Sequence, residues 1–401
     1  MGNQIGAPAT AEPDLVPRGR GWGTEPGWCD RSSPISFPSA AGPGVVHRAY
    51  ARKRHHARSG NTWCMEPWYP CCPPVFGLTP PVRAGGEDGP TPDMTRGPRW
   101  RTSSQGLHVP VDVDLTIEQR IIEAATRLPD RGMVTGWAAL RLAGVAYFEG
   151  RQRDVPVLLP HSSRIRAPGL EVSRTRRALP TPEVCYGVPC APLAAALIHE
   201  LRLEQDVREL VVMIEMALLA RAVTRREVRE ALESAPRMHT RHFNALELAT
   251  GDCRSPPEVR MMLTWRLDAG FPSPLMNREV LDRAGRRLAV VDLLDTESGS
   301  YGEYDGEAHR DRARHRRDVE RAEALREVGL EGFTVVAGDS VDVQVARMRS
   351  ARRRALWLPE GSRAWRVGPH VPMSRLTRPL SSDELQLLRS QEPPPDDWGT
   401  R

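Results

Sequence analysis

Residues 302–309 read GEYDGEAH, and we interpret this stretch as the organising element of the chain. A strand is expected to end at Asp305, the glycine that follows turns the chain, and an arginine-rich helix comes next. Because side chains alternate between the two faces of a strand, Tyr301, Glu303 and Asp305 are expected on one face. The pattern therefore predicts two carboxylates at one point, immediately before a long helix.

Another carboxylate lies inside an apolar stretch upstream, where residues 287–294 read RLAVVDLL. In a strand, Asp292 shares a face with Leu288, Val290 and Leu294, and burying a carboxylate there is costly unless something compensates its charge. A divalent cation such as Mg²⁺, which prefers oxygen ligands, is one such compensation. A strand that simply ends at Asp292, followed later by an ordinary turn at 305–306, explains the same residues without a metal.

Glu258 lies near the start of an expected helix, Pro257–Asp268. The spacing from Ser255 to Glu258 fits a capping box, which explains the glutamate without any catalytic role. However, Glu258 shares a helical face with Met262 and Trp265, and the other face is also apolar, so the helix is expected to be buried on both sides. Glu258 would then face the sheet, and both interpretations stay open.

These residues occur in an order that resembles an actinobacterial family related to the very-short-patch-repair endonucleases, within the restriction-endonuclease-like PD-(D/E)xK superfamily. The pattern that carries the resemblance is Ser255-x-x-Glu258, Asp292 and Glu303-x-Asp305-Gly306-x-x-His309. The resemblance implies a metal-dependent DNA endonuclease in which Asp292 and Glu303 hold Mg²⁺ and Glu258 is an accessory acid. It also implies that His309 or Asp305 positions or deprotonates the attacking water.

The resemblance also implies an order of elements for the C-terminal part, and the sequence patterns agree with it. The expected elements are a helix at Pro257–Asp268, strands at Leu275–Leu281, Arg287–Leu294 and Ser300–Asp305, a helix from about Glu307 to Val328, and a strand at Gly332–Val336. Residues 282–285 read DRAG, which is typical of the turn of a hairpin between the first two strands.

The helix after His309 is expected to carry one basic stripe. Arg310, Arg314, Arg317 and Arg321 follow each other at helical spacing. A charged row is usually only a solvated helix face, but this one begins beside the predicted site. We therefore expect these arginines to contact the phosphate backbone of DNA.

The overall charge of +5 and the pI near 9.0 are compatible with nucleic-acid binding. Lys53 is the only lysine, whereas nucleases of this superfamily usually carry a lysine two residues after the second acid, where this chain has Asp305. Seven cysteines form no C-x-x-C pair, which argues against a zinc site. No apolar run is long enough to span a membrane, so a cytoplasmic protein without membrane contact is expected.

The rest of the chain predicts an α+β multidomain protein. Residues 1–110 are expected to be disordered or to precede the true start, 191–250 to be a helical linker domain, 251–357 to be the nuclease-like domain with a central mixed sheet, and 358–401 to be mostly disordered. In residues 111–190, two short helices and a hairpin of Val155–Leu159 with Leu170–Arg174 suggest a winged helix, resembling type IV abortive-infection antitoxins. The alternative function is therefore a DNA-binding, antitoxin-like regulator with an inert nuclease-like domain.

Overall fold

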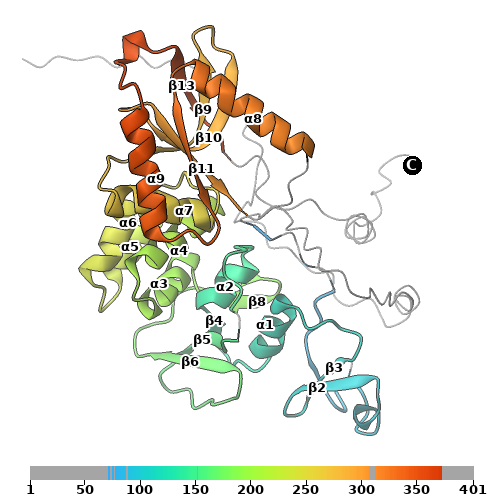
Figure 1. Ribbon diagram of the computed structural model, residues 1–401. Coiled ribbons are helices and arrows are strands. Elements are labelled where there is room, and N and C mark those ends of the chain that lie inside the picture. Colours follow the sequence, from blue (N-terminus) through green and yellow to red (C-terminus); the bar gives the residue numbers. More distant parts are fainter. Residues whose placement is uncertain are drawn as a thin grey trace, which may run out of the picture. The chain divides into compact units, whose positions relative to one another are not determined.

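The structure is a computed structural model that describes residues 71–72, 75, 77–86, 89–150, 152–306 and 312–372, and the side chains of 312–318 are not described. All of these residues lie in the second of the two units into which the chain divides, 47–401. They form a mixed α and β protein with three sheets and several helices (Figure 1). None of the helices in these ranges is long and apolar enough to cross a membrane.

The first sheet lies in a region that the sequence analysis assigned to disorder. Its order is β1-β3-β2, from Val82–Arg83, Leu107–Pro110 and Trp100–Ser104. Gly106 turns the chain between β2 and β3 at a φ of +70°. The predicted disorder up to residue 110 is therefore wrong for its last part, because cross-strand pairing and side-chain bonds to the next helix order residues that show no local periodicity. Residues 1–70 lie outside the described residues.

The second sheet has the order β6-β5-β4-β8-β7 and carries two short helices. The elements are α1 (Ile117–Ala125), β4 (Met133–Val134), α2 (Gly136–Leu142), β5 (Val155–Pro160), β6 (Leu170–Thr175), β7 (Glu183–Cys185) and β8 (Val188–Cys190). β5 and β6 pair in parallel, so the predicted hairpin between them is wrong. The connection 161–169 returns the chain to the end of the sheet where β5 begins, and only a connection of that kind permits parallel pairing.

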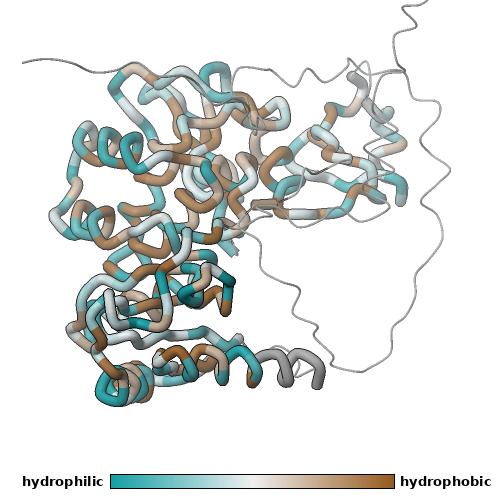
Figure 2. Tube along the Cα trace, turned by 90° about the horizontal axis from the view of Figure 1, so that it is seen from above, coloured by the Kyte–Doolittle hydropathy of each residue, from teal (hydrophilic) through white to brown (hydrophobic). Residues whose placement is uncertain are grey.

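Four helices follow, which confirms the helical prediction for residues 191–250. They are α3 (Leu193–Leu203), α4 (Val207–Leu219), α5 (Arg225–Ser234) and α6 (Thr240–Leu248). The α4 side chains Leu210, Val211 and Ile214 are completely buried, and this helix contacts α6 and the next helix, α7 (Pro256–Leu263). Apolar and polar residues alternate along the helical turns, as expected for amphipathic helices around a shared core (Figure 2).

The third sheet contains the residues singled out in the sequence. After α7 and one turn of π-helix (Thr264–Asp268) come β9 (Leu275–Asp282), β10 (Arg287–Asp295), β11 (Ser300–Asp305), α8 (Arg312–Glu327), β12 (Glu331–Val336), α9 (Val341–Arg354) and β13 (Trp365–His370). The order is β12-β11-β10-β9-β13, with β11 and β12 parallel and the other pairs antiparallel. Each predicted strand between 275 and 336 is confirmed to within one residue at either end.

Two elements at the end of this sheet were missed. α9 contacts β11 and β12, and β13 adds an edge strand beside β9 with Trp365 only 3% exposed. The predicted tail beginning at 358 is therefore wrong up to His370, because pairing with β9 orders a short segment whose glycine and proline are unfavourable for a strand. Residues 373–401 lie outside the described residues.

An aromatic stack fixes the π-helical turn after α7 against the sheet. The rings of Trp265 and Phe333 are stacked with centroids 5.8 Å apart, and Trp265 is completely buried. Phe333 covers Gly302 so closely that a Cβ atom at 302 would lie 2.3 Å from its ring. The first glycine of the GEYDGEAH stretch is therefore required for packing, and this packing sets the position of the strand that carries Glu303.

Candidate functional site

Asp292 and Glu303 lie where two strands of the third sheet stop pairing. The ladder between β10 and β11 runs from Asp295 and Ser300 to Leu293 and Gly302, and Asp292 and Glu303 are the next residues on either strand. Asp292 Oδ2 accepts a hydrogen bond of 2.9 Å from the backbone N–H of Tyr304. The structure thus brings together the two residues expected to hold a metal ion, on adjacent strands.

The Asp292 carboxylate is not fully compensated by the described part of the chain. Burial raises its pKa above the ordinary value, whereas the Tyr304 N–H and the positive charges of Arg254 and Arg321 act in the opposite direction. The balance still leaves the pKa raised, so the surroundings hold less positive charge than an ionised aspartate needs. A hard cation would supply that missing charge.

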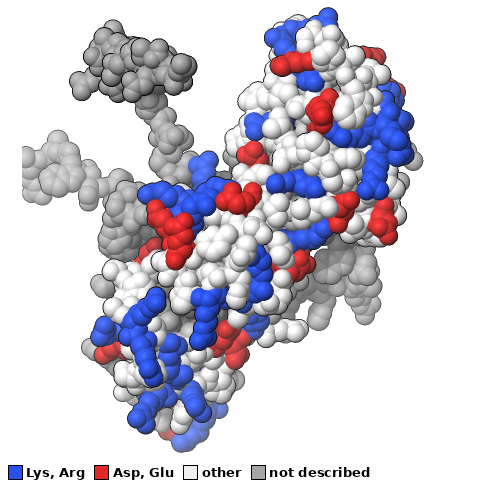
Figure 3. Space-filling view, turned by 90° about the vertical axis from the view of Figure 1, so that its left-hand side faces the viewer, with Lys and Arg blue, Asp and Glu red and all other residues white. Residues whose placement is uncertain are grey.

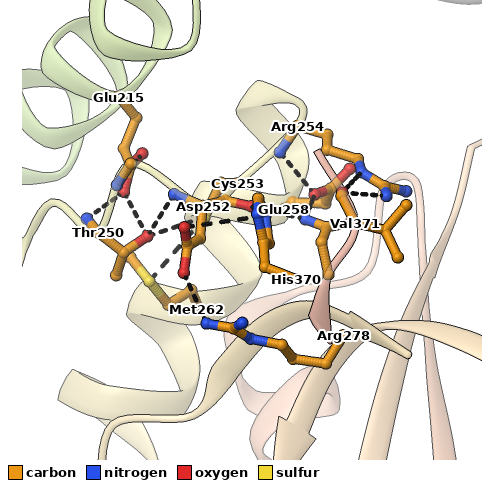
Figure 4. Close-up of polar contacts among 12 residues, drawn as sticks. Glu215, Thr250, Asp252, Cys253, Arg254, Glu258, Met262, Arg278, His370 and Val371 are labelled. Carbon is orange, nitrogen blue, oxygen red and sulfur yellow. Dashed lines mark hydrogen bonds and ion pairs between the residues drawn. The ribbon is translucent and has the colours of Figure 1, made fainter. Parts of the chain in front are cut away.

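Glu258 reaches the same place from the start of α7, and its side chain is only 8% exposed. One carboxylate oxygen accepts from Ser255 Oγ at 2.9 Å, and the other accepts from Asn277 Nδ2 at 2.8 Å. The second oxygen also accepts from the Arg254 N–H at 2.8 Å (Figure 4). Burial, together with the negative charge of Asp292, raises the pKa of Glu258 to about 7. Glu258 therefore forms hydrogen bonds at the N-terminus of α7, as the capping interpretation predicted. It also lies close enough to Asp292 for the two negative charges to repel each other.

Asn277 was missed in the sequence analysis, although it lies beside both acids. The ladder pairs Val291 with Arg278 and Leu293 with Met276, so Asn277 stands opposite Asp292. Its side chain is completely buried, and Nδ2 donates to Glu258 and, at 2.9 Å, to the Asp252 carbonyl. A polar residue inside the strand Leu275–Leu281 was the signal available in the sequence.

The two acids of the EYD stretch have different surroundings. Glu303 is partly buried and forms an ion pair with Arg321 at 2.5 Å, whereas Asp305 is exposed at the end of β11. Arg321 was expected to contact phosphate, which stays a prediction, and in the structure its guanidinium group forms the ion pair with Glu303. Asp305 is therefore not part of the buried carboxylate group, although it lies on the same strand.

Four predicted residues cannot be placed with their side chains. His309 and Arg310 lie outside the described residues, between the end of β11 and the start of α8. Arg314 and Arg317 belong to α8, but their side chains also lie outside the description. The roles assigned to these residues stay predictions.

The loop before α7 connects the acids to the end of the sheet. Arg254 donates through Nε to the carbonyl of Val371 at 3.2 Å, immediately after β13. Asp252 forms an ion pair with Arg278 at 3.3 Å, and its carboxylate lies 3.8 Å from the ring nitrogen Nε2 of His370 (Figure 4). The missed strand β13 therefore fixes the loop that presents Arg254 and Glu258.

The donor atoms at this place suit a hard divalent cation. Asp292 and Glu303 offer carboxylate oxygens, and the buried Oδ1 atom of Asn277 has no hydrogen-bond partner within the described ranges. Mg²⁺ is usually held by one or two protein carboxylates together with water and substrate phosphate. Among the described residues, no group of three or more His, Cys, Asp or Glu side chains is arranged to hold a metal ion. A two-carboxylate Mg²⁺ site fits this arrangement.

The chain was compared with protein-family models, with curated proteins and with solved structures. None of the three comparisons found a match.

Proposed function

We propose that this protein is a metal-dependent endonuclease that hydrolyses phosphodiester bonds of DNA. The observation that carries the proposal is the position of Asp292 and Glu303 on adjacent strands where β10 and β11 separate, with Glu258 close enough to Asp292 for their charges to repel. Asp292 and Glu258 both have raised pKa values, which is unfavourable for folding and is expected where chemistry requires it. The element order from α7 to β12 supports the expected resemblance to the restriction-endonuclease-like domains of the very-short-patch-repair type.

In this proposal Asp292 and Glu303 hold Mg²⁺, and Glu258 is an accessory acid. When bound, the ion polarises the scissile phosphate and lowers the pKa of a coordinated water. The ion pair with Arg321 orients the Glu303 carboxylate, while Arg254 provides positive charge beside Asp292. His309 is the proposed base and Arg310 the proposed phosphate contact, because no lysine stands near the second acid.

One observation favours the second candidate, an antitoxin-like DNA-binding regulator with an inert nuclease-like domain. Arg321 neutralises Glu303 from within the protein, which is what a site without a metal ion would need. The winged-helix part of that candidate is less well supported, because β5 and β6 form a parallel pair rather than the hairpin expected of a wing. Arginine and acidic side chains are also interspersed over the face seen in Figure 3, so no uniformly basic surface appears there.

Two assays on the full chain separate the candidates. The nuclease is expected to nick supercoiled plasmid with Mg²⁺ and to lose all nicking in EDTA. The regulator is expected to shift duplex DNA in a gel without metal, with affinity that falls as salt rises, and to leave plasmid intact. Absence of metal-dependent nicking on double-stranded, single-stranded and branched DNA would contradict the nuclease proposal.

A further inference from the structure

Asn277 has a backbone conformation that strand residues seldom adopt. Its φ is +51°, in the left-handed region that favours glycine and, among other residues, asparagine. The flanking pairs, Val291 with Arg278 and Leu293 with Met276, keep one register, so no residue is inserted at this point of the ladder. The unusual φ therefore changes the direction of one side chain without shifting the strand, which indicates that the position of this side chain matters.

The Asn277 amide uses both of its hydrogen atoms. Nδ2 donates to Glu258 Oε2 at 2.8 Å and to the Asp252 carbonyl at 2.9 Å, and the residue has no exposed surface. Its Oδ1 atom is buried without a hydrogen-bond partner in the described part of the chain. An unsatisfied buried acceptor destabilises the folded state. A residue that served only to stabilise the fold would not be expected to leave a buried acceptor unsatisfied.

Glu258 needs a donor on the side that faces the sheet. Its two other donors, Ser255 Oγ and the Arg254 N–H, both belong to the start of α7. Asn277 supplies the donor from β9, directly opposite Asp292, whose negative charge repels the glutamate. We propose that Asn277 is a positioning residue whose amide holds Glu258, the accessory acid, beside the cation site of Asp292 and Glu303. This inference rests on the proposed function, because the cation site is that of the proposed nuclease.

The variant that tests this is Asn277→Gly, because glycine adopts a positive φ readily and removes the amide without straining the strand. Arg237→Gly is the matched control, since Arg237 has a φ of +59° and is exposed in the turn before α6. Binding of Mn²⁺ to the full chain is measured by calorimetry, and near-ultraviolet circular dichroism reports the fold. Loss of a residue that orients the groups around a metal ion weakens metal binding by roughly 10–100-fold.

The expected result is Mn²⁺ binding at least about tenfold weaker in Asn277→Gly and unchanged in Arg237→Gly. In a Glu258→Gln background, Asn277→Gly should weaken binding by no more than about twofold further, because a positioning residue has no effect once its target is altered. Asn277→Ser, which keeps one donor, should lie between the wild type and Asn277→Gly. If Asn277→Gly does not unfold cooperatively, the Mn²⁺ affinity of Asn277→Ser is the deciding measurement. Asn277→Ser is expected to bind Mn²⁺ at least about threefold more weakly than the wild type.

Three results would overturn the inference. The first is wild-type Mn²⁺ affinity in Asn277→Gly, or in Asn277→Ser where that variant decides. The second is an equal loss in the wild-type and Glu258→Gln backgrounds, which would mean that Asn277 acts independently of Glu258. The third is a wild-type protein that binds no Mn²⁺, which removes the cation site itself. If the wild type binds Mn²⁺ but nicks no DNA, the nuclease proposal fails and the Mn²⁺ affinities still decide the role of Asn277.

Discussion

The second and third sheets each contain an interior strand, β5 and β10, and these two strands differ in character. In β5 the inward side chains Val155, Val157 and Leu159 are apolar and at most 2% exposed. In β10 the completely buried Val291 and Leu293 flank Asp292, whose pKa is raised by burial. The inward side chains of β5 stabilise the fold through apolar burial alone. β10 stabilises it less, because it holds the Asp292 carboxylate in a poorly hydrated place. Changes in β5 should therefore act on stability, and changes at Asp292 should act on chemistry.

The largest expected effect is that of Asp292→Asn on DNA nicking, a loss on the order of 100-fold or more. The amide oxygen can still accept from the Tyr304 N–H, and the change removes a charge that Glu258 repels. The melting temperature in EDTA should therefore not fall. Plasmid nicking rates and thermal melts measure both effects, with Glu360→Gln at an exposed position as the control. Equal nicking by the variant and the wild type would remove Asp292 from the site.

The opposite effect is expected in β5. Leu159→Ala should lower the free energy of unfolding by about 2–5 kcal/mol, because Leu159 is completely buried and the cavity can relax only partly. The nicking rate per folded molecule should stay unchanged. Urea unfolding measures the first quantity, and nicking at a temperature where the variant is folded measures the second. A large loss in the nicking rate per folded molecule of Leu159→Ala would show that the second sheet affects the chemistry as well as the stability.

The sequence was sufficient to predict the framework of the third sheet. Alternating side chains and a DRAG turn specify β9, β10 and β11 locally. The alternation placed Glu303 with Asp305, whereas the pairing of Asp292 with Glu303 was implied only by the family resemblance. Asn277 was not predicted, because its importance depends on a hydrogen bond to Glu258, which is distant in sequence. The direction of β6 was predicted wrongly, because the path of the connecting loop and not the strand pattern decides between parallel and antiparallel pairing.

The start of the folded region was also predicted wrongly from composition, because contacts between residues distant in sequence hold residues before 111 in an ordered structure. Glu123 of α1 is only 7% exposed and accepts hydrogen bonds from Arg101 Nη1 at 2.9 Å and Ser103 Oγ at 2.6 Å, both on β2. The disorder expected for residues 1–110 predicts that a chain beginning at Val111 folds as cooperatively as the full chain. The contacts predict instead that this truncation leaves a buried carboxylate without its partners.

We therefore expect a chain of residues 111–401 to lose about 2 kcal/mol of unfolding free energy, while a chain of residues 71–401 keeps the value of the full chain. Denaturant unfolding of the three chains measures the difference. Restoring residues 71–110 but with Arg101→Ala and Ser103→Ala should reproduce most of the loss. If the chain of residues 111–401 were as stable as the full chain, the contacts of β2 with α1 would not contribute to stability.

The smallest expected effect concerns two buried glutamates with opposite pKa shifts. Glu215 of α4 is completely buried, and burial raises its pKa even though Thr250 and Gly251 donate to it. Burial also acts to raise the pKa of Glu123, but hydrogen bonds from Arg101, Ser103 and Gln119 and the charge of Arg101 outweigh it and lower that pKa. The two residues should therefore give stability opposite dependences on pH.

The sign follows from which state binds the proton more tightly. Folded Glu215 keeps its proton to a higher pH than the unfolded chain does, so its contribution to stability falls as pH rises above the ordinary glutamate pKa. Folded Glu123 loses its proton at a lower pH, so its contribution is present above the ordinary pKa and is lost as pH falls through the lowered one. Melting temperatures in EDTA from about pH 2 to about pH 8 test this, because the Glu123 window lies below the ordinary glutamate pKa. The wild type should lose stability relative to Glu215→Gln as pH rises, and should gain it relative to Glu123→Gln. Each slope should amount to no more than about 1.4 kcal/mol per pH unit, the limit for one titrating group. Slopes of the same sign for both variants would show that at least one of these carboxylates is not held as the structure describes.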